Sequence, residues 1–177
     1  MNGSPVNPDH RGVNFRDWAF TATVSAPLHT DADAAKYVPT GYRTSSPEEI
    51  MARPIAKDLK IPTVPAIETA APQMTPLIDG PCWLVPLPAS NGSITANSML
   101  ARAIAELVPG ARVKCAIGRA HPVESSSQRR TRGMLGLTVQ QHAIIRTAGP
   151  MLFLPVYFVD NVITTGTTID ACRHALG

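Results

Sequence analysis

The sequence predicts an α/β fold, an open parallel sheet flanked by helices with an irregular N-terminal arm before it. Residues 156–159 are four consecutive apolar or aromatic residues, which is typical of a strand buried on both faces. Residues 82–117 alternate between strand and helix patterns, as parallel sheets require. Residues 1–75, by contrast, are rich in Pro, Asp, Ser and Thr and show little periodicity. We therefore divide the chain into an arm or hood, residues 1–75, and a core, residues 76–177.

The bulk composition narrows the class of protein. A chain of 177 residues has room for one domain with a real core, and 44% hydrophobic against 16% charged residues excludes a wholly disordered chain. The net charge of +3 suits a small anionic ligand better than it suits a dedicated nucleic-acid binder. Three isolated cysteines, no export signal and no apolar run of about 18 residues predict a cytoplasmic protein with reduced thiols and no membrane span.

Two elements stand out within the arm. Residues 18–24 have a β-rich composition and predict a short strand. Ser46 is a good start for a helix, because its capping hydroxyl is followed by Pro47 and two acids. We expect this helix to run towards Leu59, with a kink or break at Pro54.

The first half of the core shows a strand, a helix and a second strand. Residues 82–88 predict a buried strand that ends in prolines. Residues 97–108 are amphipathic and predict a helix, which Asn97 or Ser98 would cap and Pro-Gly would end. Residues 111–117 predict the second strand.

A phosphate-type motif follows the last predicted strand. Asp160 and Asn161 stand where that strand would end, residues 164–168 form a Thr/Gly loop, and residues 169–176 predict a helix. Loop N–H groups and a helix N-terminus favour a phosphate, and ligands gather at the carboxyl ends of parallel strands. A Walker loop is excluded because no lysine follows Lys114. The alternative is an ordinary buried strand followed by a Thr-rich turn.

The run of residues 156–168 closely resembles the phosphoribosyl-pyrophosphate (PRPP) motif of type I phosphoribosyltransferases. Asp160 matches the first acidic position of that motif, whereas the second is Asn161, which brings no charge. The resemblance implies that Asp160 and Asn161 hold the ribose hydroxyls and that the loop binds the 5′-phosphate. The loop residues are Thr164, Thr165, Gly166, Thr167 and Thr168.

A second motif lies upstream at the expected distance. The V-P-L-P run at residues 85–88, followed by the helix core at residues 98–103, is similar to the competence-protein F (ComF-like) branch of the same family. In the wider family the loop between them cradles pyrophosphate through backbone N–H groups. The resemblance implies this role for Ser90, Asn91, Gly92 and Ser93.

The third motif is the polar stretch at residues 119–133. It carries Arg129, Arg130 and Arg132 after a serine run, and the ComF-like branch is also Arg-, Gln- and Thr-rich here. The resemblance implies a mobile loop that closes over pyrophosphate, where arginine forks would stabilise the leaving charge. The alternative is a solvated basic loop that touches nucleic acid.

The resemblance implies a phosphoribosyltransferase of nucleotide metabolism. A nitrogen acceptor, for example a nucleobase, would attack C1 of PRPP and release pyrophosphate. Mg²⁺ would bridge the phosphates, with Asp160 as an indirect ligand through PRPP and water. The alternative is a non-catalytic PRPP or nucleotide sensor, or an accessory protein of DNA metabolism, because Asn161 is neutral and no general base stands out. The acceptor would be recognised by the hood.

The strand at residues 156–160 is expected to have an open edge. Phosphoribosyltransferases place a further parallel strand there, and the chain stops at Gly177. An apolar open edge is a template for pairing. We favour truncation of the core, or cover by residues 18–24, over cover by a second copy in a homodimer or by another partner.

Overall fold

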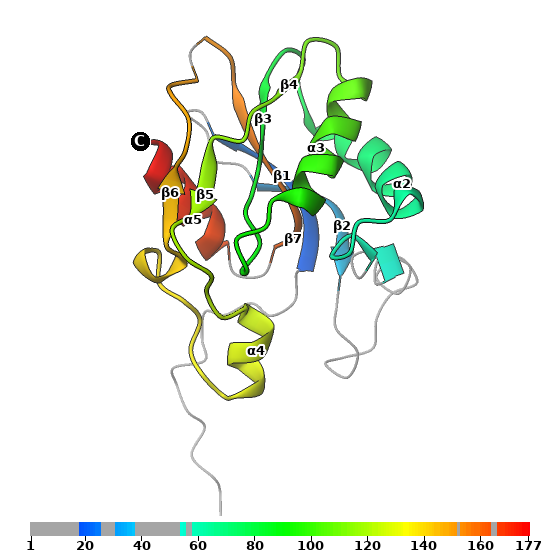
Figure 1. Ribbon diagram of the computed structural model, residues 1–177. Helices are drawn as coiled ribbons and strands as arrows, with labels where there is room; N and C mark the ends of the chain where they lie inside the picture. The colour runs from blue at the N-terminus through cyan, green and yellow to red at the C-terminus, as the bar shows by residue number, and fades with distance from the viewer. Residues whose placement is uncertain (1–17, 26–30, 38–53, 56–57, 152, 164–165) are drawn as a thin grey trace, which may run out of the picture.

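The protein is built on a mixed five-stranded sheet with the strand order β2–β1–β7–β3–β4 (Figure 1). The computed structural model describes residues 18–25, 31–37, 54–55, 58–151, 153–163 and 166–177. Strands β7, β3 and β4 are parallel, and helices flank them, so the predicted α/β architecture is confirmed at this level. The sheet strands are β1 (Trp18–Ser25), β2 (Asp31–Tyr37), β3 (Trp83–Pro86), β4 (Arg112–Val113) and β7 (Val156–Ile163).

Helices and a small second sheet cover the central sheet on both sides. In Figure 1, α2 and α3 lie on one side, and α5 lies with β5 and β6 on the other. Strands β5 and β6 pair antiparallel with each other. Among the described residues, no helix is long and apolar enough to cross a membrane. The remaining elements are α2 (Val64–Met74), the 3₁₀ turn η2 (Thr75–Leu77), α3 (Thr95–Leu107), β5 (Ile117–Arg119), α4 (Ser126–Thr131), the 3₁₀ turn η3 (Gln140–His142), β6 (Ile144–Arg146) and α5 (Thr167–Leu176).

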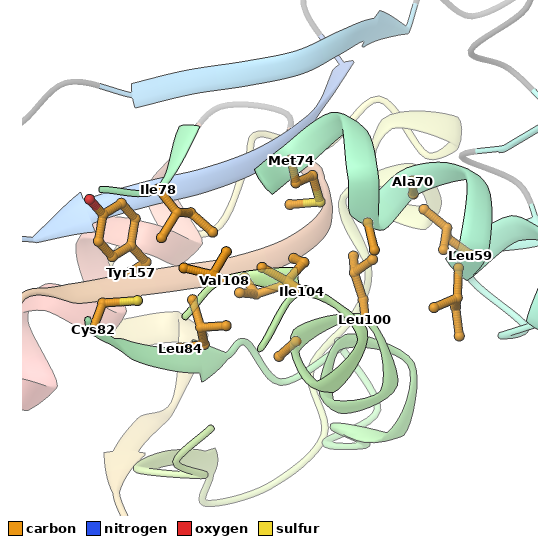
Figure 2. Close-up of a cluster of buried hydrophobic side chains, with 14 of the residues drawn as sticks. Leu59, Ala70, Met74, Ile78, Cys82, Leu84, Leu100, Ile104, Val108 and Tyr157 are labelled. Carbon is orange, nitrogen blue, oxygen red and sulfur yellow. The ribbon is translucent and has the colours of Figure 1, made fainter. Parts of the chain in front are cut away.

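The paired segments of β3 and β7, residues 83–86 and 156–159, are apolar or aromatic because both faces of the sheet are covered there. Successive side chains of a strand point to opposite faces, so Leu84 and Tyr157 join a cluster with α2 and α3. Their neighbours Val85 and Phe158 join a second cluster with α5, β5 and β6. Figure 2 shows the first cluster, in which Met74 of α2 and Ile104 of α3 meet the strands.

Helix α2 lies in the stretch that we expected to be largely irregular. Thr63 caps it by accepting a hydrogen bond from the Ala66 N–H at 3.4 Å, and a proline stands in its first turn, where no N–H is needed. Ala70 and Met74 are fully buried within the first cluster. The capping threonine and the alanines are helix signals that we did not predict from, because Pro72 within the helix obscures the pattern. Most of the helix predicted from Ser46 lies outside the described residues.

The N-terminal segment supplies two strands, so the arm is less irregular than predicted. The strand predicted at residues 18–24 is confirmed as β1, and β2 pairs antiparallel beside it. Strand β1 also pairs antiparallel with β7, from Ser25 opposite Val156 to Ala19 opposite Ile163. The arm therefore covers the edge of β7 through β1, as one of the favoured alternatives predicted.

Three predicted boundaries differ from the structure. The strand expected at residues 111–117 is only β4, because the chain leaves the central sheet after the Lys114 N–H donates to the Leu84 carbonyl at 2.9 Å. Ile117 then starts β5 in the second sheet. Helix α3 begins at Thr95 instead of at a cap on Asn97, and β7 continues past Asp160, although its parallel pairing with β3 ends at Val159.

Candidate functional site

A cavity of about 460 Å³ opens at the carboxyl ends of β3 and β7. Its volume lies within the range of small-molecule sites, and its position is the usual one for ligands in open α/β sheets. It brings together parts of the three sequence motifs. The lining residues include Lys60, Pro62, Pro88, Ala89, Ser90, Asn91, Ser93, Asn97, Arg119, Glu124, the serines 125–127, His142, Asp160, Asn161, Gly166 and Thr168.

Asp160 is one of two carboxylates that line this cavity. Its Oδ1 accepts hydrogen bonds from Asn97 Nδ2 at 3.0 Å and from the Asn161 N–H at 2.9 Å. Burial raises the pKa of Asp160 to about 6. The hydrogen bonds from Asn97 and from the backbone N–H groups of Asn161 and Val162, and the charge of Arg119, act in the opposite direction and lower this pKa. The protein thus holds a carboxylate where its charge is unfavourable for folding.

Asn161 lines the cavity but is also tied to the rest of the protein. Its Nδ2 donates to the Leu59 carbonyl at 3.1 Å. A carboxylate at this position has no proton to donate at neutral pH. The amide therefore makes a contact that the acidic residue of the family motif would not make.

We expected Asn97 or Ser98 to cap the helix, and the structure gives Asn97 a different place. It lies inside α3 and is buried, with 4% of its surface exposed. Its Nδ2 donates to the Leu87 carbonyl at 2.8 Å as well as to Asp160. The signal was present in the sequence, since Asn97 shares a helix face with Leu100, Ala101 and Ile104.

Arg119 and His142 also line the cavity. Arg119 begins the third motif but was not predicted as a site residue, and neither was His142. The Arg119 guanidinium donates to the carbonyl of Ala89 at 2.8 Å, to that of Pro88 at 3.4 Å and to that of His142. Burial lowers the pKa of Arg119, and burial with the Arg119 charge lowers the pKa of His142 to about 4. Arginine keeps its charge in proteins, so Arg119 places a fixed cation beside a histidine that is neutral at pH 7. His142 Nδ1 lies 3.4 Å from Thr168 Oγ1.

The described part of the phosphate loop forms the N-terminus of α5. Gly166 precedes the helix with φ of 77°, a left-handed conformation that favours glycine. Among the described residues, no side chain caps this end of α5, and both Gly166 and Thr168 line the cavity. The helix dipole places partial positive charge there. Thr164 and Thr165 lie outside the described residues, and Thr167 is the first residue of the helix.

The loop predicted to meet pyrophosphate lines the cavity, but its backbone donors are partly used. The Gly92 N–H donates to the Ala89 carbonyl at 2.9 Å, and the Ser93 N–H donates to Asn91 Oδ1 at 3.0 Å. The N–H groups of Gly92 and Ser93 are therefore bonded within the turn in this structure, and the role of the loop in binding pyrophosphate stays a prediction. The turn folds on itself because Gly92, with φ of 87°, and the Asn91 side chain close it locally.

The three arginines of the third motif do not line the cavity. A short helix, α4, carries Arg129 and Arg130, and Ser125 and Gln128 form a capping box at its start. Glu124, itself a lining residue, binds Arg132 at 3.0 Å and Arg129 at 3.7 Å. The sequence predicted an arginine-rich segment beside the site, and the structure adds a carboxylate that holds two of its cations.

The described residues offer no dedicated metal centre. No group of three or more His, Cys, Asp or Glu side chains among them lies close enough to hold a metal ion. Cys82, Cys115 and Cys172 are free thiols, and the first and last are buried. Asp160 and Glu124 are the carboxylates among the lining residues, so a cation at this site needs oxygen ligands from the bound molecule.

The chain was compared with known proteins by sequence and by structure. No protein-family model, no curated protein and no solved structure matches it.

Proposed function

We propose that this protein binds PRPP together with Mg²⁺ and transfers the phosphoribosyl group to a nitrogen acceptor, releasing pyrophosphate. One observation carries the proposal: segments resembling three phosphoribosyltransferase motifs, far apart in the chain, meet at one cavity at the carboxyl end of β3 and β7. An ordinary strand followed by a Thr-rich turn does not require this convergence.

Each part of the cavity suits one part of PRPP. The N-terminus of α5, with Gly166 and Thr168, favours the 5′-phosphate. Asp160 offers acceptor oxygens to the ribose hydroxyls, and the fixed cation Arg119 supports the phosphate groups. Lys60 and Pro62 also line the cavity, which supports a role for the N-terminal stretch in recognising the acceptor.

Magnesium would arrive with the ligand in this proposal. When bound, Mg²⁺ neutralises charge on pyrophosphate and makes it a better leaving group. The residues fit this role only indirectly, because Asp160 already accepts hydrogen bonds and no cluster of ligands surrounds it among the described residues. Its part is to hold the sugar beside the phosphates.

The arginines would act after a rearrangement of α4. Glu124 binds Arg129 and Arg132, and a pyrophosphate with Mg²⁺ would compete with that carboxylate for the same guanidinium groups. The arginines would then exchange the Glu124 carboxylate for the pyrophosphate, and each would remain paired with an anion throughout. Closure in this way would exclude water from the reacting carbon.

A specific observation also supports the second candidate, a non-catalytic PRPP or nucleotide sensor. Asn161 is neutral and bound to Leu59, and none of the three arginines lines the cavity. A sensor needs affinity for the anion without stabilisation of a leaving group. It would bind PRPP and release no pyrophosphate.

The transferase and the sensor are distinguished by incubating the protein with PRPP, Mg²⁺ and a series of nucleobases and measuring the pyrophosphate released. Release with at least one acceptor, lost in Asp160→Ala and kept in Asp79→Asn, supports the transferase. Asp79 is a matched control because it is exposed and lies before β3, away from the lining residues. Binding of PRPP without release supports the sensor, and no binding contradicts both.

A further inference from the structure

Arg119, the last residue of β5, holds backbone carbonyls of two different segments at once. Its Nε donates to the Ala89 carbonyl at 2.8 Å and its Nη2 to the Pro88 carbonyl at 3.4 Å, both in the loop after β3. Its Nη1 donates to the His142 carbonyl, in the 3₁₀ turn before β6. One planar guanidinium therefore joins the loop after β3 to η3.

The loop after β3 depends on this contact for its position. Strand pairing holds the chain as far as Leu87, whose N–H donates to the Val159 carbonyl at 2.9 Å. Beyond Leu87, the loop is attached by Arg119 and by the Val123 N–H, which donates to the Ser90 carbonyl at 2.8 Å. The hydrogen bonds at the tip of the loop shape its turn but do not attach it to another element. Arg119 thus holds the loop against the second sheet.

His142 continues this connection to α5. Its carbonyl accepts from Arg119, and its Nδ1 lies 3.4 Å from Oγ1 of Thr168, in the first turn of α5. His142 is buried, and Ala143 directly after it has φ of 51°, which is unfavourable for alanine. The surrounding contacts therefore hold this turn in a defined position. Polar contacts run from the loop after β3, through Arg119 and His142, to the N-terminus of α5.

The segments at the two ends of this path both line the cavity. Ala89 and Ser90 belong to the loop after β3, and Gly166 and Thr168 to the start of α5. In the proposed function the loop meets pyrophosphate and the start of α5 meets the 5′-phosphate. A ligand with anionic groups at both ends gains affinity over its separate parts only when the spacing of the two subsites matches its own. A spacing that is held before the ligand arrives lowers the cost of ordering on binding.

We infer that Arg119 is a positioning residue, which fixes the spacing between the loop after β3 and the N-terminus of α5 so that both bind one molecule of PRPP. The inference rests on the proposed function and concerns how the site recognises the whole ligand instead of its parts. The role needs the shape of arginine as well as its charge. A lysine ammonium has one nitrogen and cannot meet the three carbonyls with the geometry of the guanidinium fork.

The test compares the whole ligand with its parts. PRPP, ribose 5-phosphate and inorganic pyrophosphate, each with Mg²⁺, are titrated into the full chain and into Arg119→Lys, and weak binders are measured by competition against PRPP. The variant keeps the cation and loses the fork. It should bind ribose 5-phosphate and pyrophosphate within about threefold of wild type, because each subsite remains, and PRPP roughly tenfold more weakly, because the spacing is lost. A residue that only stabilised the fold would not separate the whole ligand from its parts.

Arg146 offers a matched control in the same small sheet. It lies in β6 and also donates to two backbone carbonyls, those of Ala148 at 2.9 Å and Leu176 at 3.1 Å. It does not line the cavity. Arg146→Lys makes the same chemical change and should bind all three ligands as wild type does.

The outcomes separate this inference from the proposed function. If PRPP binds wild type and Arg119→Lys weakens all three ligands equally, or none of them, the inference fails and the proposed function stands. If PRPP does not bind wild type, both fail. Should Arg119→Lys not fold, a homologue of PRPP with one methylene inserted between C5 and the 5′-phosphate decides on wild type alone. Binding of the homologue within about twofold of PRPP overturns a fixed spacing, and roughly tenfold weaker binding supports it.

Discussion

Replacing Asp160 with asparagine removes a buried charge while keeping the size of the side chain. The wild-type pKa of Asp160 rises from 3.8 to about 6, chiefly through burial. That rise corresponds to about 3 kcal/mol of lost stability above pH 6, since each pKa unit is worth about 1.36 kcal/mol. The figure is an upper limit, because the carboxylate lies at a water-accessible cavity. We expect the isosteric Asp160→Asn to recover about 1 to 2 kcal/mol, since one oxygen replaces two as hydrogen-bond acceptors.

The sign of the pH dependence follows from the direction of the shift. The native state holds the proton more tightly than the unfolded state between pH 3.8 and about 6. The contribution of Asp160 to wild-type stability is therefore most favourable below that window, falls as pH rises through it, and stays low above it. The variant lacks this group, so its advantage over wild type should be present at pH 7.5 and absent near pH 4.

Urea unfolding of both proteins at pH 4, 5, 6 and 7.5 measures this difference. Other titrating groups are shared and cancel in the comparison, and Asp79→Asn controls for the change in net charge. A difference between Asp160→Asn and wild type that is the same at all four pH values would refute the argument. A variant that gains stability at pH 7.5 and loses PRPP binding would show that Asp160 is kept for its function.

Three further predictions concern the surroundings of the site. Asn161→Asp should weaken PRPP binding and lower stability by about 1 kcal/mol, because it loses the donor to the Leu59 carbonyl; tighter Mg²⁺-dependent binding in a titration would contradict this. Trypsin should cut beside Arg132 faster in Glu124→Gln than in wild type, because the variant loses the ion pair with Arg132. PRPP should slow the cut in both proteins. A cleavage rate that PRPP does not change would support the alternative that α4 is a solvated basic segment without a role in binding. Amides of residues 156–160 should exchange slowly, and deleting residues 1–30 should speed them, because β1 pairs with β7; unchanged exchange would argue against that pairing.

The local patterns predicted the strands and helices that build the floor of the site. The apolar runs of β3 and β7 and the amphipathic face of α3 were sufficient, because burial on one or two faces leaves a periodic signature. Cover of the β7 edge by β1 was one of the alternatives that its composition and the open edge favoured, and the structure adds the antiparallel direction of the pairing. Helix α2 was missed because prolines within it mask an alanine-rich pattern.

The partners of polar side chains were the part that the sequence did not reveal. The three carbonyls around Arg119 come from distant segments, and contacts of this kind have no periodic signature. The role of Asn97 was also missed, because we expected a helix cap at this position. Its place on the buried face of α3 was the available signal, since a buried amide implies specific partners.

Calorimetric titration of PRPP with Mg²⁺ into the full chain tests the central claim most directly. The account predicts saturable binding at one site per chain, largely lost in Asp160→Ala and retained in Asp79→Asn. It also predicts a rise in melting temperature with ligand, equivalent to about 2.7 kcal/mol at a hundredfold excess over Kd. Absence of saturable binding, or binding that Asp160→Ala leaves unchanged, would contradict the assignment of this cavity.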